Sequence, residues 1–304
     1  MNLNDKTKKV TETAIITALM TILVIIGLFV MPIAIILFPV PYIILGVRHD
    51  VKYGLISIIG SGILLTILVD ITVGIFITLL LGFLSVGLSY MIRKKFKTYQ
   101  IITGGIVISI VSVIITINII AYITGISVVG QVESYFAEMI KVAQEVGLPN
   151  SQTELLKNRI ETAKLTIPST MIIFSIFNTY INYWVSVAIL RRLGHNIPKI
   201  PKFKYFRLPG NVVTGSLVII LCTSLIWYLQ ILYYKTIAIN VMSLLMFIFF
   251  IQGISVIMYL LDKTKLNRVL KVFIIIFAML YVPIIGIVGF IDAIFDFRKL
   301  RKNI

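Results

Sequence analysis

The chain has 304 residues, of which 59% are hydrophobic and only 13% are charged. Soluble domains carry about 25% charged residues, so this composition excludes an ordinary soluble enzyme. The formal net charge of +16 does not indicate nucleic-acid binding, because the basic residues stand in short clusters between long apolar runs. The sequence predicts an all-α integral membrane protein, a bundle of about eight or nine transmembrane helices.

Apolar runs of bilayer length follow one another along the chain, and about 20 residues suffice to cross the hydrocarbon core. The second run is short and broken by prolines, and Pro283 and Gly286 interrupt the last. The predicted spans are 13–31, 32–47, 53–69, 72–92, 101–124, 167–190, 212–234, 236–261 and 272–297.

Basic clusters follow every second predicted span and set the orientation. Such clusters mark cytoplasmic loops, so the N-terminus is predicted to be cytoplasmic and the protein to be a multi-pass protein of the bacterial cytoplasmic membrane. The alternation also requires the short segment 32–47 to cross, since otherwise Arg93 to Lys97 would lie outside. The clusters lie at 6–9, 48–52, 93–97, 191–207 and 263–271.

The C-terminal stretch breaks this alternation. One more full crossing would place the basic tail 298–302 outside, and two crossings need about 40 residues, more than the stretch contains. We expect either a half-membrane hairpin that turns at 283–286 or a shallow interfacial helix that carries Asp292, Asp296 and Arg298. Both arrangements keep the basic end inside.

A polar insertion at 125–166 separates the fifth span from the sixth. Apolar residues recur in it at helical spacing until Gly147 and Pro149 break the pattern, and Ser151 with Glu154 has the spacing of a capping box that starts a second helix. We predict an external helical hairpin with one apolar face. It is either a structural flap on the outer membrane surface or a lid over a site that opens outward.

Motifs of familiar enzyme chemistry are missing from the sequence. The dipeptide Gly-Lys never occurs, which excludes a phosphate-binding P-loop, and no HExxH, CxxC or GxSxG pattern is found. His49 and His195 are interpreted as polar residues at the cytoplasmic interface rather than as metal ligands. We therefore predict no enzyme activity, no catalytic residue, no metal and no cofactor.

Acidic residues are scarce within the predicted spans. Glu12 lies at the inner start of the first span and Asp70 at the outer end of the third. Acids inside the membrane mark proton- or sodium-coupled carriers, so a self-powered secondary transporter is disfavoured. The eighth span instead carries two neutral amides, Asn240 and Gln252.

Neutral polar residues in the fifth and sixth spans form the candidate substrate pocket. Asn178 and Asn182 lie one helical turn apart with Tyr180 between them, and Asn118 and Tyr122 are similarly spaced in the outer half of the fifth span. An amide in hydrocarbon needs a partner, so one interpretation is helix–helix hydrogen bonding. The functional alternative is a pocket for a small organic solute, with amides for direction and aromatic rings for stacking.

The first span carries small residues four apart in the sequence Ala14-Ile15-Ile16-Thr17-Ala18, a spacing that lets another helix approach closely. A proline bend, Phe38-Pro39-Val40-Pro41, precedes the short second helix. With the basic N-terminus, these features make residues 8–190 resemble the substrate-binding S components of energy-coupling-factor (ECF) transporters. The tail 289–299 and the chain as a whole resemble the YybS-like family of bacterial polytopic membrane proteins.

The S-component resemblance implies a docking role for Ala14 and Ala18 against an ECF-type membrane subunit, with partner ATPases supplying energy. It implies a solute pocket on the outer side of a six-helix unit. We therefore predict a protein that binds a small solute for uptake and relies on a partner. The alternative is a non-transport membrane scaffold whose basic loops recruit partners or anionic lipid. The predicted divisions are a membrane unit at 1–190, a basic cytoplasmic loop at 191–210, and C-terminal helices with a basic tail at 211–304.

Overall fold

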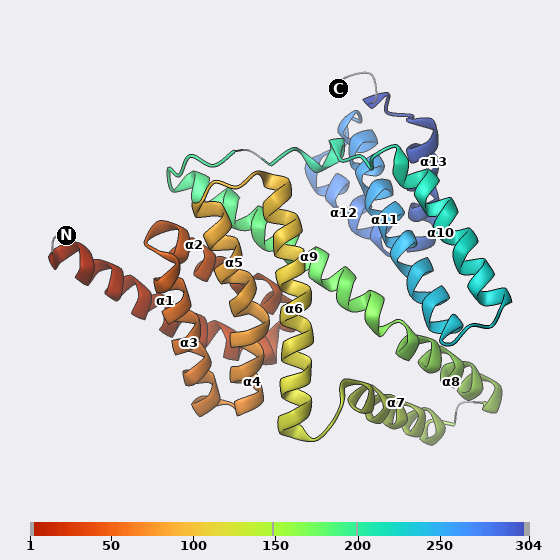
Figure 1. Cartoon of the computed structure of the whole chain (residues 1–304), viewed down its shortest axis with the longest axis horizontal. Helices are drawn as coiled ribbons and strands as arrows, with labels where there is room; N and C mark the ends of the chain where they lie inside the picture. The colour runs from red at the N-terminus through yellow and green to blue at the C-terminus, as the bar shows by residue number, and fades with distance from the viewer. Residues whose placement is uncertain (1–2, 148, 199, 301–304) are drawn as a thin grey trace. The chain divides into compact units, whose positions relative to one another are not determined.

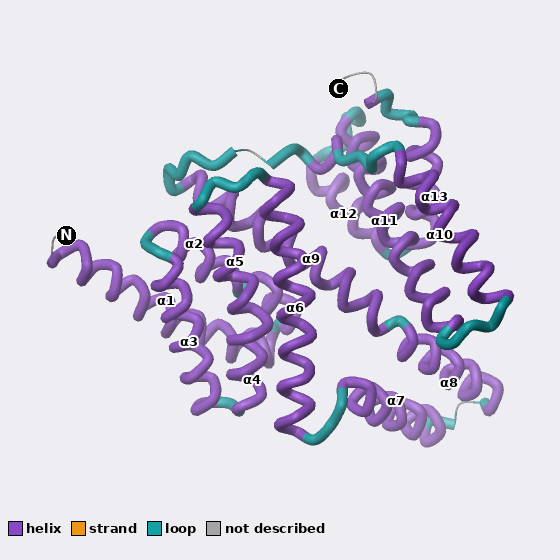
Figure 2. The backbone as a smooth tube through the Cα atoms, viewed as in Figure 1, coloured by secondary structure: helices purple, strands orange, loops and turns teal. Residues whose placement is uncertain are grey.

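The computed structural model describes residues 3–147, 149–198 and 200–300 (Figure 1). Every long element within these ranges is a helix, and no strand occurs among them, which confirms the predicted fold class (Figure 2). Among the described residues, seven helices are long and apolar enough to cross a membrane, or up to eight if a bent C-terminal pair counts as one span. The proline-broken second segment is too short to pass that test.

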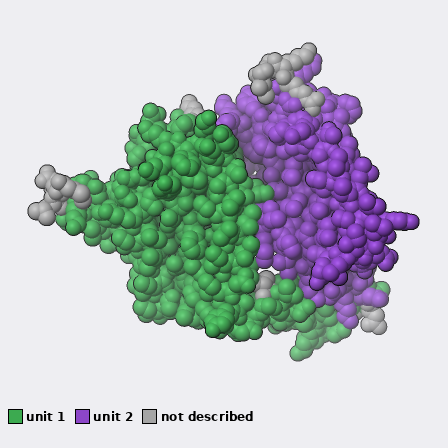
Figure 3. Space-filling view, viewed as in Figure 1, with its two compact units in different colours: residues 1–153, 174–200 green, residues 154–173, 201–304 purple. Residues whose placement is uncertain are grey.

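Two compact units make up the chain (Figure 3). They differ from the predicted divisions because the second half of the insertion and the start of the sixth span belong with the C-terminal helices. There the Asn240 amide accepts a hydrogen bond from the Ser169 N–H at 2.7 Å and donates one to the Leu165 carbonyl at 2.6 Å. Unit 1 comprises Met1–Thr153 and Phe174–Ile200, and unit 2 comprises Glu154–Ile173 and Pro201–Ile304.

Unit 1 holds the elements before the insertion and most of the helix after it. Asp50 and Asp70 cap the helices that follow them, each accepting a backbone N–H two residues on. The Thr72 hydroxyl and N–H hold the pKa of Asp70 below its usual range. The elements are α1 (Leu3–Val30), the 3₁₀ segment η1 (Pro32–Leu37), α2 (Pro39–Arg48), α3 (Val51–Leu68), α4 (Ile71–Phe76), the π segment η2 (Ile77–Leu81), α5 (Gly82–Arg93), α6 (Thr98–Thr124), α7 (Val128–Glu145) and α9 (Ile167–Arg192), whose first residues lie in unit 2.

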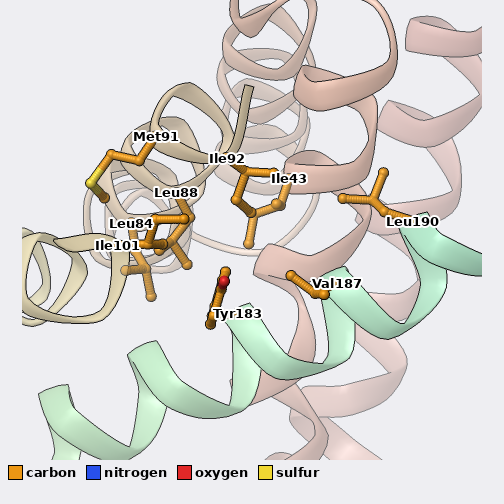
Figure 4. Close-up of a cluster of buried hydrophobic side chains, with 9 residues drawn as sticks. All are labelled: Ile43, Leu84, Leu88, Met91, Ile92, Ile101, Tyr183, Val187 and Leu190. Atoms are coloured by element: carbon orange, nitrogen blue, oxygen red, sulfur yellow. The ribbon is translucent and has the colours of Figure 1, made fainter. Parts of the chain in front are cut away.

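The apolar core of unit 1 joins side chains from four helices, α2, α5, α6 and α9. Figure 4 shows Tyr183 and Val187 of α9 extending towards side chains of α2, α5 and α6. These side chains pack closely against one another, and the van der Waals contacts between them hold the helices together. The buried members are Ile43, Leu84, Leu88, Met91, Ile92, Ile101, Tyr183, Val187 and Leu190.

The short second segment returns to the end of unit 1 where α1 begins. Glu12 of α1 lies 2.7 Å from the His49 ring and 3.2 Å from Arg48, both at the end of α2. Arg93, at the end of α5, lies 3.3 Å from Asp50 and donates to the His49 carbonyl at 2.7 Å. The last residues of α2 and α5 and the first turns of α1 therefore lie at the same basic end of unit 1, as the charge alternation predicted.

The predicted insertion hairpin contains two helices, α7 and α8 (Asn150–Leu165). The chain between them breaks where the sequence indicated, because Gly147 adopts a φ of 78° that favours glycine. α8 spans the boundary between the two units.

The longest helix of unit 2 is α11 (Tyr234–Asp262), and α13 (Val282–Phe295) packs against it. Gly286 lies against Met246, and three residues on, Gly289 lies against Phe249. A Cβ atom on Gly289 would lie 1.9 Å from the Phe249 carbonyl oxygen, so only glycine allows this backbone approach. The other elements are the 3₁₀ turn η3 (Phe203–Tyr205), α10 (Asn211–Tyr228) and α12 (Arg268–Met279).

The C-terminal stretch is bent by 101° between α12 and α13. The break falls at Leu280 and Tyr281, shortly before the predicted turn at 283–286, because Pro283 lies in the first turn of α13, where its missing N–H has no helical acceptor. Beyond α13, Arg298 donates hydrogen bonds to the Lys204 and Phe206 carbonyls of the basic loop. The start of the tail therefore lies at the same end of unit 2 as this loop. Arg301 and Lys302 lie outside the described residues.

Candidate functional site

One face of α9 carries five neutral polar side chains that are buried inside unit 1. Two of them are adjacent and the others follow at steps of three or four residues, which places them on a single side of the helix. Each has 0% of its surface exposed, so each polar atom there needs a hydrogen-bond partner to offset its desolvation. The polar face of α9, as we call it, consists of Ser175, Asn178, Thr179, Asn182 and Ser186.

Asn182 connects α9 to the proline-broken segment. Its Nδ2 donates to the Ile36 carbonyl of η1 at 2.8 Å, and to both the backbone oxygen and Oδ1 of Asn178, each at 2.8 Å. A 3₁₀ segment that begins at one proline and is followed by two more leaves carbonyls without helical donors. Asn182 supplies one such donor, which agrees with the prediction that these amides bond helices together.

The same two amides also have open ends. Among the described residues, Asn178 Nδ2 and Asn182 Oδ1 have no hydrogen-bond partner. The amide orientations follow from the contacts: Asn182 Nδ2 faces three oxygens and must be the donor, so Asn178 Oδ1 is the acceptor. The pair therefore presents one open donor group and one open acceptor.

Helix α6 has a buried polar face of its own. It meets the polar face of α9 where Gly105 approaches Thr179, since a Cβ on Gly105 would lie 2.5 Å from Thr179 Cγ2. Within the described part of the chain, the hydroxyls of Ser109, Ser112 and Thr116 have no partner. Both faces are neutral, and both offer hydrogen-bonding capacity that the helices do not use.

The structure does not bring Asn118 and Tyr122 to this site. Asn118 is exposed and donates to the Ile114 carbonyl of its own helix at 2.8 Å, and Tyr122 is 90% exposed. Asn118 follows Ser112 by six residues, which turns it away from the buried face of α6. Tyr180, two residues from Asn178, lies at the edge of the polar face of α9 and is only partly buried. Of the five residues predicted to line a pocket, only Asn178 and Asn182 therefore lie together on a buried face, and the pocket itself stays a prediction.

The proposed docking residues lie on an open side of α1. Thr17 faces inward, where its hydroxyl bonds Ser57 Oγ at 3.0 Å and its carbonyl accepts from Ser61 at 3.2 Å. Ala14 and Ala18, on either side of it in sequence, are exposed. Unit 1 therefore leaves the alanine side of α1 available to another helix.

An apolar groove of about 440 Å³ opens between α3 and α4, beside Ile119 of α6. The hydroxyls of Thr66 and Thr78 in its wall bond carbonyls of their own helices at 3.0 and 2.8 Å. These hydroxyls are therefore already used within the protein. The groove has the character of a lipid-facing surface rather than of a site that orients a polar solute.

Unit 2 contains a buried ion pair that the sequence did not reveal. Arg298 donates from Nε and Nη2 to Asp292 Oδ2 at 3.1 and 2.9 Å, and both side chains are 1% exposed. Gln252 Nε2 donates to the same oxygen at 2.6 Å. Asp292 is thus buried within unit 2, and both predicted arrangements of the C-terminal stretch stay open.

Arg298 also fixes the basic loop to α11. Its Nη1 donates to the Lys204 carbonyl at 3.0 Å and to Ser255 Oγ at 2.8 Å, and its Nη2 donates to the Phe206 carbonyl at 2.9 Å. Nearby, Asp262 accepts a hydrogen bond from Lys204 and raises the pKa of that ammonium group. A charged residue such as Asp292 in an apolar stretch needs a partner, which the sequence indicated, but it did not indicate which residue is the partner.

Comparison with known proteins places the chain in a family. A family model described as a predicted membrane protein (DUF2232) matches residues 18–293. The chain belongs to this family. It is 24% identical over 315 residues to "Uncharacterized protein YybS" of Bacillus subtilis (strain 168), an alignment that covers 98% of this chain and 99% of the relative. No solved structure matches the chain.

The predicted membership of the YybS-like family is confirmed, whereas the S-component resemblance stays a prediction. In this DUF2232 member, no three His, Cys, Asp or Glu side chains among the described residues gather within reach of one metal ion.

Proposed function

We propose that this DUF2232 protein binds a small neutral solute inside unit 1 for uptake, in the manner of an S component, and acts without enzymatic chemistry. The observation that carries the proposal is the polar face of α9. Open amide and hydroxyl groups are costly in a bundle surrounded by lipid, because no bulk water reaches them. A bound solute would give Asn178 and Asn182 the partners that the described part of the chain does not supply.

Energy for uptake comes from a partner in this proposal. The polar faces of α6 and α9 consist of neutral residues, so they provide no carboxylate to couple solute movement to protons or sodium. In unit 2, the Asp292 carboxylate is already paired with Arg298. We place the N-terminus and the basic loops on the cytoplasmic side of the cytoplasmic membrane, following the positive-inside rule.

The Asn178→Leu variant tests solute binding. We expect wild-type protein purified from its native membrane to release a small organic molecule on denaturation, and the variant to release at least about tenfold less, the effect of losing 1.4 kcal/mol of binding. The variant should fold, because Asn182 Nδ2 keeps its bonds to two backbone carbonyls. Mass spectrometry of the released molecules measures the difference.

Asn118→Leu is the matched control, because it makes the same change on an exposed face of α6. It should retain the molecule at the wild-type level. The competing candidate is a scaffold, favoured by the bond from Asn182 to Ile36. A scaffold would release no molecule, and Asn178→Leu would then lower stability by only about 0.6 kcal/mol, as is typical of interhelical hydrogen bonds.

Partner docking makes a separate prediction on α1. Ala14→Leu combined with Ala18→Leu should leave the protein inserted but abolish copurification with an ECF-type membrane subunit and its ATPases, because the larger side chains prevent close backbone approach. Ala188→Leu, on an exposed position of α9, is the control and should copurify normally. Equal recovery of the subunit with both variants would remove the docking role.

A further inference from the structure

The two open amide ends in unit 1 define the chemistry of what can bind there. Asn178 Nδ2 is a donor and Asn182 Oδ1 is an acceptor, and the two amide groups are joined by a 2.8 Å hydrogen bond. Their orientation is fixed, because Asn182 Nδ2 also donates to the Ile36 carbonyl. A single molecule that satisfies both ends presents an acceptor to Asn178 Nδ2 and a donor to Asn182 Oδ1.

We infer that the solute carries a secondary-amide edge, an N–H next to a C=O, as in a ring lactam. The inference rests on the proposed function and names its substrate class. The carbonyl of such an edge accepts from Asn178 Nδ2, and its N–H donates to Asn182 Oδ1. A single hydroxyl has one oxygen for both roles and is less suited to two separate amide ends.

Charge argues against ionic solutes at this site. The polar faces of α6 and α9 consist of serine, threonine and asparagine, so a buried carboxylate, phosphate or ammonium would meet no opposite charge there. An unpaired charge buried away from water is strongly disfavoured.

The hydroxyls at the site adapt to a ligand rather than select it. Ser175, Thr179 and Ser186 can rotate to donate or accept, so they complement many polar atoms. The two amides cannot exchange roles, because Asn182 would then lose its bonds to the backbone carbonyls of Ile36 and Asn178. The asparagine pair therefore determines the ligand class.

Four probes separate the chemical classes in thermal unfolding of the full chain in nanodiscs. Uracil has the ring N–H beside C=O, 1,3-dimethyluracil keeps the carbonyls but blocks each N–H, glycerol offers only hydroxyls, and sodium benzoate is a planar anion. We expect millimolar uracil to raise Tm by roughly 2–4 °C, as binding to the native state does, and the other three to leave it unchanged. Asn178→Leu should abolish the uracil shift, and Asn118→Leu should keep it.

The outcomes distinguish the substrate class from the proposed function. Equal shifts with uracil and dimethyluracil, or a shift with glycerol or benzoate but not with uracil, would overturn the amide edge and leave solute binding intact. A released native molecule that contains an amide N–H beside a carbonyl would support the inference even without a uracil shift, and one without that group would overturn it. If wild-type protein releases no molecule and no probe raises Tm, the proposed function itself fails, and the inference fails with it.

Discussion

Replacing Arg298 with methionine is expected to lower the unfolding free energy of unit 2 by about 3–5 kcal/mol, the usual cost of removing one partner of a buried ion pair. The substitution leaves Asp292 charged and 1% exposed, with Gln252 as its remaining donor. The carbonyls of Lys204 and Phe206 lose their guanidinium donor as well. The loop and the tail should therefore loosen together.

Unfolding in nanodiscs, followed by denaturant titration, measures this loss. Lys299→Met is the control, because it removes a neighbouring but exposed positive charge. Adding Asp292→Asn to Arg298→Met should recover part of the stability, since no uncompensated charge then remains buried. Identical stability of Arg298→Met and Lys299→Met would show that the ion pair does not stabilise unit 2.

A valine at position 289 is expected to destabilise unit 2 by about 3 kcal/mol or more, at the upper end of what overpacking costs. The new Cβ would lie 1.9 Å from the Phe249 carbonyl oxygen and 2.5 Å from the Gly253 nitrogen. Both are backbone atoms, which cannot rotate away as a side chain does. The two helices would have to separate, and the hydrogen bond between Gln252 and Asp292 would weaken with them.

Gly215→Val provides the matched control for this prediction. It makes the same change within α10, where a Cβ on Gly215 meets no described atom within 4 Å. Valine has a higher helix propensity than glycine, so Gly215→Val should leave the stability unchanged or raise it slightly. Equal unfolding midpoints for the two valine variants would contradict the close packing of α11 against α13.

The sequence predicted the features that depend on composition, charge and chain breaks. Apolar runs indicated the helices, Gly147 marked the break in the insertion, and alternating basic clusters required the short second segment to return. Each of these features depends on neighbouring residues or on the side of the membrane where positive charges lie, so it can be predicted without knowing how the helices pack.

Which side of a helix faces inward was harder to predict. The apolar residues of α6 are spread around the whole helix, so hydrophobic periodicity does not distinguish its buried face from its lipid-facing one. Asn118 and Tyr122 were accordingly assigned to the site and proved to be exposed. The small residues Gly105 and Ser109 carried the better signal, since close helix contacts in membranes favour small side chains.

The spacing of residues in the sequence did not predict that Arg298 pairs with Asp292. The chain leaves α13 at Asp296, where φ is 47°, and turns back so that Arg298 reaches the carboxylate. Such a left-handed conformation is uncommon outside glycine, although aspartate tolerates it better than most residues. No helical periodicity describes a contact made across this turn.

The most direct test of solute binding in unit 1 is the wild-type measurement in the release experiment. Protein purified from its native membrane is denatured, and the small molecules set free are identified and counted by mass spectrometry. We expect a neutral organic molecule, in an amount comparable to the protein and depleted in Asn178→Leu but not in Asn118→Leu. Wild-type protein that releases nothing beyond the Asn178→Leu sample would contradict this expectation.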